Sequence, residues 1–221
     1  WKPSICFAGW PWVSGGCPVN GWSSSYPETT GYIIPTLLQY AADRNDGNIR
    51  DAAMRAADWL ISIQRPPGGW QGGRVNENKP PIVFNTAQII RGIMGVYKLT
   101  GDQKYLQSEQ KAGDWLCSIQ DEDGSWTRFA LMGKSRVYDS YVAYPLLMLH
   151  KETRLEKYRK HAVKNLDWIV NSKQHVNGWF QDCDNTVKHN DRPILHTIAY
   201  TLDGLLESDE FAGDGEFLEA A

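Results

Sequence analysis

The sequence predicts an all-α fold, an α/α toroid in which helical hairpins form two concentric layers. A segment that reads Trp-Leu-x-Ser-Ile-Gln begins at Trp59 and at Trp115 and recurs more loosely from Trp168. This gives a repeat of about 55 residues. Helices with one polar face alternate along the chain with helices that are apolar nearly all round. Period-2 alternation of apolar and polar residues is nowhere sustained, which argues against a strand-rich fold.

The enclosed helices are expected to form the inner layer, because a helix that is apolar on every side must be surrounded by others. They cover residues 32–40, 87–99, 141–149 and 198–206. Each has a helix breaker at a similar depth, namely Pro35, Gly92, Pro145 and Gly204. The amphipathic helices of the outer layer end at the repeated segments and cover residues 49–63, 105–119 and 158–169.

The whole chain, 1–221, is expected to be a single α/α-hairpin domain that is truncated at both ends. Residues 207–221 parallel the start of another outer helix, so about three and a half hairpins are present. A closed ring of six such hairpins needs about 330 residues. Edge hairpins without neighbours expose apolar surface, which makes a homodimer a possible partner state.

Charge and hydropathy exclude two classes of partner. The 26 acidic and 23 basic residues give a net charge of −3, with no block of like charge, so neither nucleic acid nor a membrane surface is an expected partner. No apolar stretch approaches the length of a membrane span.

The connections between helices indicate which face carries the chemistry. Those from an inner to an outer helix are short, whereas those from an outer to the next inner helix take about twenty residues, at 65–84, 121–138 and 175–195. Long loops in a compact domain are usually functional. The working face is therefore expected at the N-terminal ends of the inner helices.

Four polar residues mark the starts of these helices at the spacing of the repeat. They are Glu28, Asn85, Asp139 and His196, and we expect them to point toward one central cavity. Helix capping is the alternative, although Glu28 and His196 are poor caps. In the functional interpretation Asp139 is a general acid or base with Glu28 as its partner, His196 and Tyr200 transfer protons or orient groups, and Asn85 binds substrate.

Aromatic and basic residues of the long loops suit a sugar with a carboxylate. Indole rings stack on sugar faces, and guanidinium groups bind carboxylates. The alternatives are loop packing for the tryptophans and ordinary solvated charge for the arginines. The candidate binding residues are Trp70, Trp126, Trp179, Arg128, Arg136 and Tyr26.

No metal or other cofactor is expected. Asp182, Cys183, His189 and His196 lie in one region of the chain, but their spacing matches no zinc signature. Cys6 and Cys17 are close in sequence, and whether they are bonded stays open.

The repeated segment, followed by Asp-Gly-Ser-Trp at 123–126, resembles the α/α-toroid superfamily of terpenoid cyclases, protein prenyltransferases, six-hairpin glycosidases and uronate-processing lyases and epimerases. Residues 25–36 resemble VpsJ-type proteins of bacterial exopolysaccharide gene clusters. Residues 121–124 do not match the Asp-x-Asp-Asp acid motif of terpenoid cyclases, and no prenyltransferase zinc pattern is present. The arrangement is similar to that of unsaturated glucuronyl hydrolases, which implies catalytic carboxylates at Glu28 and Asp139.

These observations favour a protein that acts on an acidic, uronate-containing polysaccharide as a hydrolase, lyase or C5-epimerase. One alternative is a non-catalytic protein that binds or assembles glycans in exopolysaccharide biosynthesis. Another is an enzyme that resembles a terpenoid cyclase. The four polar residues at the starts of the inner helices, which form a polar ring, argue against this alternative.

Overall fold

The computed structural model describes residues 16–17, 21–186, 193–212 and 215–221. A two-residue strand, β1 (Gly16–Cys17), pairs antiparallel with β2 (Gly21–Trp22). Cys6 lies outside the described residues, so the question of a bond between Cys6 and Cys17 stays open. Cys117 and Cys183 are free thiols.

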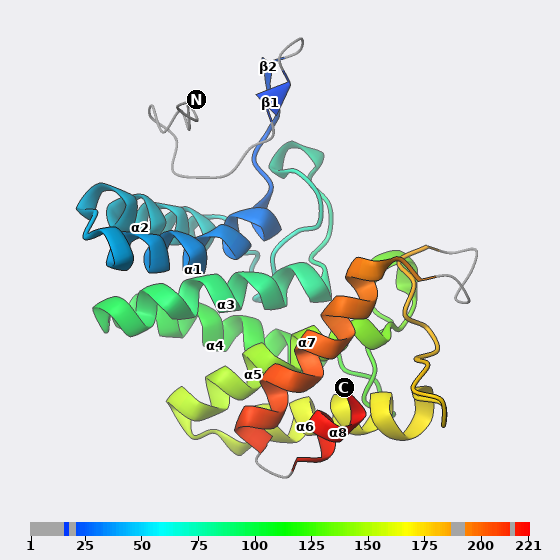
Figure 1. Cartoon of the computed structure of the whole chain (residues 1–221). Coiled ribbons are helices and arrows are strands. Elements are labelled where there is room, and N and C mark those ends of the chain that lie inside the picture. Colours follow the sequence, from blue (N-terminus) through cyan, green and yellow to red (C-terminus); the bar gives the residue numbers. More distant parts are fainter. Residues whose placement is uncertain (1–15, 18–20, 187–192, 213–214) are drawn as a thin grey trace.

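The remaining elements of the described residues are helices, and they form the two predicted layers (Figure 1). The inner helices are α1 (Pro27–Arg44), α3 (Val83–Thr100), α5 (Ser140–Thr153) and α7 (Leu195–Ala212). The outer helices are α2 (Gly47–Ser62), α4 (Gln103–Ser118), α6 (Glu156–Lys173) and the short α8 (Glu216–Ala220). The long loops contain the 3-10 turns η1 (Val75–Glu77), η2 (Leu131–Gly133) and η3 (Val137–Asp139). Consecutive inner helices pack side by side, which confirms the α/α toroid arrangement.

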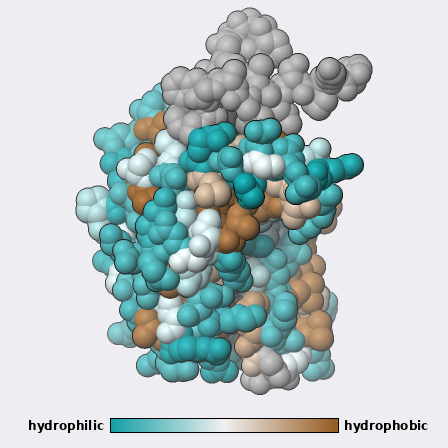
Figure 2. Space-filling view, turned by 90° about the vertical axis from the view of Figure 1, so that its left-hand side faces the viewer, coloured by the Kyte–Doolittle hydropathy of each residue, from teal (hydrophilic) through white to brown (hydrophobic). Residues whose placement is uncertain are grey.

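The short connections of the first three hairpins share a left-handed turn, and the first two also share an aspartate cap. The residue after each of the first three inner helices adopts the left-handed conformation, with φ of 50° at Asn45, 69° at Gly101 and 60° at Arg154. Asp46 and Asp102 then cap the outer helices through hydrogen bonds from backbone N–H groups. Figure 2 shows the face where these connections lie as mostly hydrophilic, with separate apolar areas.

Glycines let the inner helices approach one another closely. A Cβ atom on Gly92 would lie 2.4 Å from the carbonyl oxygen of Gly31 in α1, and one on Gly204 would lie 2.4 Å from the backbone of Ser140. Helices α1 and α5 continue through Pro35 and Pro145. The glycines therefore fix the distance between neighbouring inner helices.

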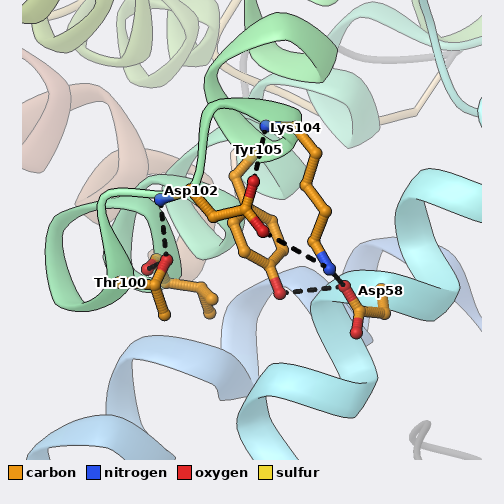
Figure 3. Close-up of polar contacts among 6 residues, drawn as sticks. Asp58, Thr100, Asp102, Lys104 and Tyr105 are labelled. Atoms are coloured by element: carbon orange, nitrogen blue, oxygen red, sulfur yellow. Dashed lines mark hydrogen bonds and ion pairs between the residues drawn. The ribbon is translucent and has the colours of Figure 1, made fainter.

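A repeated polar contact joins successive outer helices (Figure 3). The Asp58 carboxylate of α2 accepts a hydrogen bond from the Tyr105 hydroxyl at 2.8 Å and pairs with Lys104 Nζ at 2.8 Å. Asp114 of α4 makes the same two contacts with Tyr158 and Lys157 of α6. Residues 216 and 217 are Glu and Phe where the earlier repeats have Lys and Tyr, and burial raises the pKa of the corresponding Asp167.

One carboxyl lies unpaired in the core between the layers. Glu109 of α4 is fully buried, and neither of its oxygens has a hydrogen-bond partner within residues 21–186, 193–212 and 215–221. Burial raises the pKa of Glu109 well above its ordinary value of 4.5, and the nearby charge of Glu152 adds to this, whereas Lys98 opposes it. Glu109 is therefore neutral in the folded protein at pH values where the unfolded chain has lost this proton.

Glu109→Gln is expected to flatten the pH dependence of stability. Because the folded-state pKa is raised, the contribution of Glu109 is fully present below its unfolded pKa and is lost as the pH rises toward the folded pKa. Urea unfolding at several pH values above 4.5 checks this. The exposed Glu122→Gln should keep the wild-type slope, and an equal slope in both variants would contradict the assignment.

None of the described helices is both long and apolar enough to cross a lipid bilayer.

Candidate functional site

The predicted polar residues lie at the N-terminal ends of the inner helices, where the long loops gather (Figure 1). Glu28, Asn85 and His196 are in the first turns of α1, α3 and α7, and Asp139 directly precedes α5. The N-cap residues of α1, α3 and α5 make no side-chain cap hydrogen bond. Capping therefore does not account for the side chains of Glu28, Asn85 and Asp139.

Glu28 belongs to a hydrogen-bonded group that joins α1 to α3. The Tyr26 hydroxyl donates to Glu28 Oε2 at 2.9 Å, and Asn85 Nδ2 donates to the Tyr26 oxygen at 3.5 Å. Burial raises the pKa of Glu28, and the hydrogen bond from Tyr26 opposes this shift. Burial together with the charge of Glu28 raises the pKa of Tyr26 to about 12, so Tyr26 acts here as a donor.

Asp139 is the second carboxyl of the site. Its residue is 3% exposed, and Oδ2 has no hydrogen-bond partner in the part of the chain that the structure describes. Burial raises the pKa of Asp139 to about 8, although the charge of Arg136 opposes the shift. Asp139 is therefore largely protonated at neutral pH and has a proton to donate.

Below these carboxyls, four rings form an aromatic layer, one from each inner helix: Tyr32, Phe84, Tyr141 and Tyr200. Tyr200 is central, with its ring centroid 5.3 Å from those of Phe84 and Tyr141 and 6.5 Å from that of Tyr32. The exposed His196 packs edge-on against Tyr200 at 5.6 Å. Sequence reasoning singled out Tyr200 and missed the role of Phe84, which precedes Asn85.

A charged pair lies next to this layer and was not predicted. The Arg91 guanidinium is 4.1 Å from the centroid of the Tyr141 ring and pairs with Glu207 Oε1 of α7 at 2.8 Å. The contact joins the second inner helix to the fourth. The signal in the sequence was a single arginine within an otherwise apolar helix.

The predicted stacking role of Trp70 and Trp126 is wrong. Both residues are 0% exposed, so their indole rings offer no surface to a sugar. Their Nε1 atoms donate to the backbone oxygens of Leu60 at 2.7 Å and Leu116 at 3.0 Å, at the ends of the preceding outer helices. These tryptophans fasten the start of each long loop, which was the alternative interpretation.

Trp179 occupies a different place in the repeat from the one assumed. Gly68, Gly124 and Gly178 all adopt positive φ and donate their N–H groups in the same turn. The residue two positions later is Trp70, Trp126 or Phe180, and Phe180 is also buried. Trp179 therefore lies one position out of register, and it is 39% exposed.

The two candidate arginines are not brought together at a surface. Arg136 is 3% exposed and donates from Nη2 to the Thr186 oxygen at 2.8 Å, so its guanidinium is engaged by the protein's own backbone and does not lie at an open surface. Arg128 is exposed and lies over the ring of Phe129 at 5.6 Å.

Each long loop returns to the start of the inner helix of its own hairpin. Val75 N–H donates to the Ser25 oxygen just before α1, at 3.0 Å. The Phe129 oxygen accepts from Val83 at the start of α3, also at 3.0 Å, and the Asp182 oxygen accepts from Val137 just before α5, at 3.2 Å. Each hairpin therefore supports its own site residue.

The described residues contain no group of three or more His, Cys, Asp and Glu side chains arranged to hold a metal ion. His189 lies outside these residues. The buried Cys183 thiol contacts the Thr201 hydroxyl at 3.4 Å.

Comparison with protein-family models finds no match. A squalene–hopene cyclase from Zymomonas mobilis subsp. mobilis is 23% identical over 200 residues, which cover 80% of this chain and 29% of the cyclase.

Solved structures show the same fold at 11–16% identity. An unsaturated glucuronyl hydrolase specific for heparin has a TM-score of 0.72 over 94% of this chain and 58% of its own. A GH76 α-mannanase from Bacteroides thetaiotaomicron scores 0.69 over 88% and 55%. A cellobiose 2-epimerase from Bacillus thermoamylovorans scores 0.62 over 89% and 57%. The chain thus spans less than two thirds of each of these proteins.

Proposed function

We propose that this chain carries part or all of the active site of an enzyme that acts on an acidic, uronate-containing polysaccharide. The observation that carries the proposal is the pair of carboxyls, Glu28 and Asp139, at one end of the inner helices above the aromatic layer. Support comes from structural neighbours whose names describe action on glycans, and from the resemblance of residues 25–36 to exopolysaccharide proteins of the VpsJ type.

The two carboxyls supply the required acid–base chemistry. Asp139, which holds its proton at neutral pH, protonates the leaving glycosidic oxygen in a hydrolase or lyase and delivers a proton to C5 in an epimerase. Glu28, held by Tyr26, is the base that activates water in a hydrolase or removes the C5 proton in a lyase or epimerase. Asn85 bonds the substrate, and His196 and Tyr200 orient it. Arg128 binds the substrate carboxylate. The half-buried rings of Tyr32, Phe84 and Tyr200 take the stacking role expected of the tryptophans.

The proposal is tested by incubating the protein with uronate-containing and neutral oligosaccharides. Products are followed by mass spectrometry, and proton exchange is followed in deuterated water. Shorter products identify a hydrolase or lyase, and deuterium at C5 of a chain that has not been cleaved identifies an epimerase. Binding without either result would favour a glycan-binding or assembly protein and overturn the enzyme proposal.

A terpenoid cyclase-like enzyme is the second candidate. The identity to squalene–hopene cyclase favours it, and so does the aromatic layer, because aromatic faces stabilise carbocations. The polar ring and the absence of the Asp-x-Asp-Asp motif at residues 121–124 argue against it. Conversion of squalene, with no effect on any glycan, would decide for this candidate.

A further inference from the structure

The segment that ends in Asp139 is held by the loop between α6 and α7. Residues 182–186 of that loop, here called the bracing segment, lie against it. The Asp182 oxygen accepts from Val137 N–H at 3.2 Å, and the Thr186 oxygen accepts from Arg136 Nη2 at 2.8 Å. Arg136 also accepts the Asp139 N–H through its own backbone oxygen at 3.2 Å. Arg136 thus connects the bracing segment to the carboxyl residue.

The bracing segment is itself firmly anchored. The Asp182 carboxylate pairs with Lys173 of α6 at 2.7 Å, and both side chains are mostly buried. Asp184 is buried and accepts from the Thr186 N–H at 2.9 Å and from the Thr186 hydroxyl at 3.0 Å. Asp182 has a φ of 64°, in the left-handed region that aspartate adopts more readily than most non-glycine residues.

The charges around Asp139 explain why this carboxyl keeps its proton although the positive charge of Arg136 is nearby. Lys173 is paired with the Asp182 carboxylate, and Asp184 is a further buried carboxyl of the bracing segment, so an ionised Asp139 would add another buried negative charge. Among the described residues, the other titratable groups near this segment are Tyr138, Cys183 and Glu28, and none of these is a cation.

The geometry points to Arg136 as a positioning residue, whose guanidinium is oriented by the bracing segment and whose backbone oxygen holds the Asp139 N–H in the turn before α5. Its role is thus to place and polarise the acid from within the protein, while the substrate is met by other groups. The inference rests on the proposed function in that it takes Asp139 as the acid.

The test is an NMR titration of the Asp139 carboxyl carbon, with the signal assigned from Asp139→Asn. Arg136→Met keeps the bulk of the side chain and removes its charge. It is expected to raise the proton affinity of Asp139 about tenfold or more, because an opposite charge nearby has been lost. Arg136→Lys should restore most of the change. The matched control is Arg128→Met on the preceding loop, which should leave the titration unchanged.

Two results would overturn the inference. One is an unchanged titration in Arg136→Met, together with a loss of glycan binding. The other result comes from a second variant, Lys173→Met, which is measured if Arg136→Met does not fold. This substitution breaks the ion pair between Lys173 and Asp182. That variant should speed amide exchange at Val137 and raise the proton affinity of Asp139. The absence of both changes would overturn the inference. Since the titration needs no substrate, an inactive protein with the expected shift would refute the proposed function alone.

Discussion

Asp139→Asn is expected to lower turnover of the acidic glycan by about 10²–10⁴-fold while the fold is retained. The amide has the shape of the acid but has no carboxyl proton to transfer. Glu28→Gln should act similarly, because it keeps an acceptor for the Tyr26 hydroxyl and loses the base. Asp43→Asn, at the other end of α1, should retain full turnover. Unimpaired turnover in Asp139→Asn would remove Asp139 from the mechanism.

The same substitution has an effect on stability that needs no substrate. The pKa of Asp139 in the folded protein is about 8, against an ordinary value of 3.8, so its contribution is present below 3.8 and is lost as the pH rises through about 8. Asp139→Asn should therefore gain stability relative to the wild type as the pH is raised between these values. Thermal unfolding at both ends of the range measures this, and parallel curves would contradict the pKa assignment.

The largest loss of stability is expected from Gly92→Val, at about 3 kcal/mol. The added Cβ would lie 2.4 Å from the Gly31 oxygen and 3.0 Å from its Cα, and these backbone atoms cannot move unless α1 separates from α3. Gly92→Ala already introduces this atom and should also destabilise the protein. The free energy of unfolding in urea measures both effects.

Gly95→Ala, one turn further along α3, is the matched control. A Cβ at Gly95 meets only the end of the Leu38 side chain, at 3.1 Å, and a flexible side chain can move aside. The better helix propensity of alanine should then leave stability unchanged or raise it by up to about 1 kcal/mol. Equal losses in Gly92→Ala and Gly95→Ala would show that the contact between α1 and α3 is not what limits stability.

The fold could be predicted because periodicity records which helix faces are buried. A helix that is apolar all round, such as α3, can only be an inner helix, and the repeated tryptophans fix the period. The positions of Glu28, Asn85 and Asp139 followed from the same period. The tryptophans misled, because a Trp that follows a glycine in a loop has the same pattern whether it stacks on a ligand or packs against the preceding helix.

Side-chain direction could not be obtained from spacing. Arg136 and Arg128 both lie in the loop before α5, but one is buried and the other is exposed, and this depends on the bracing segment some fifty residues later. Arg91 was missed for the same reason, because its partner Glu207 belongs to a helix two hairpins away. Such contacts depend on tertiary structure, and the sequence pattern of a single helix does not show which distant residues it will contact.

The return of each long loop to its own inner helix has a consequence for how such a ring can change over evolution. One unit of inner helix, outer helix and loop contains both a site residue and the backbone that supports it. Duplicating or exchanging a unit would therefore transfer one functional position together with its scaffold. A ring assembled in this way can acquire a new specificity one unit at a time, while the neighbouring units keep the geometry they already had.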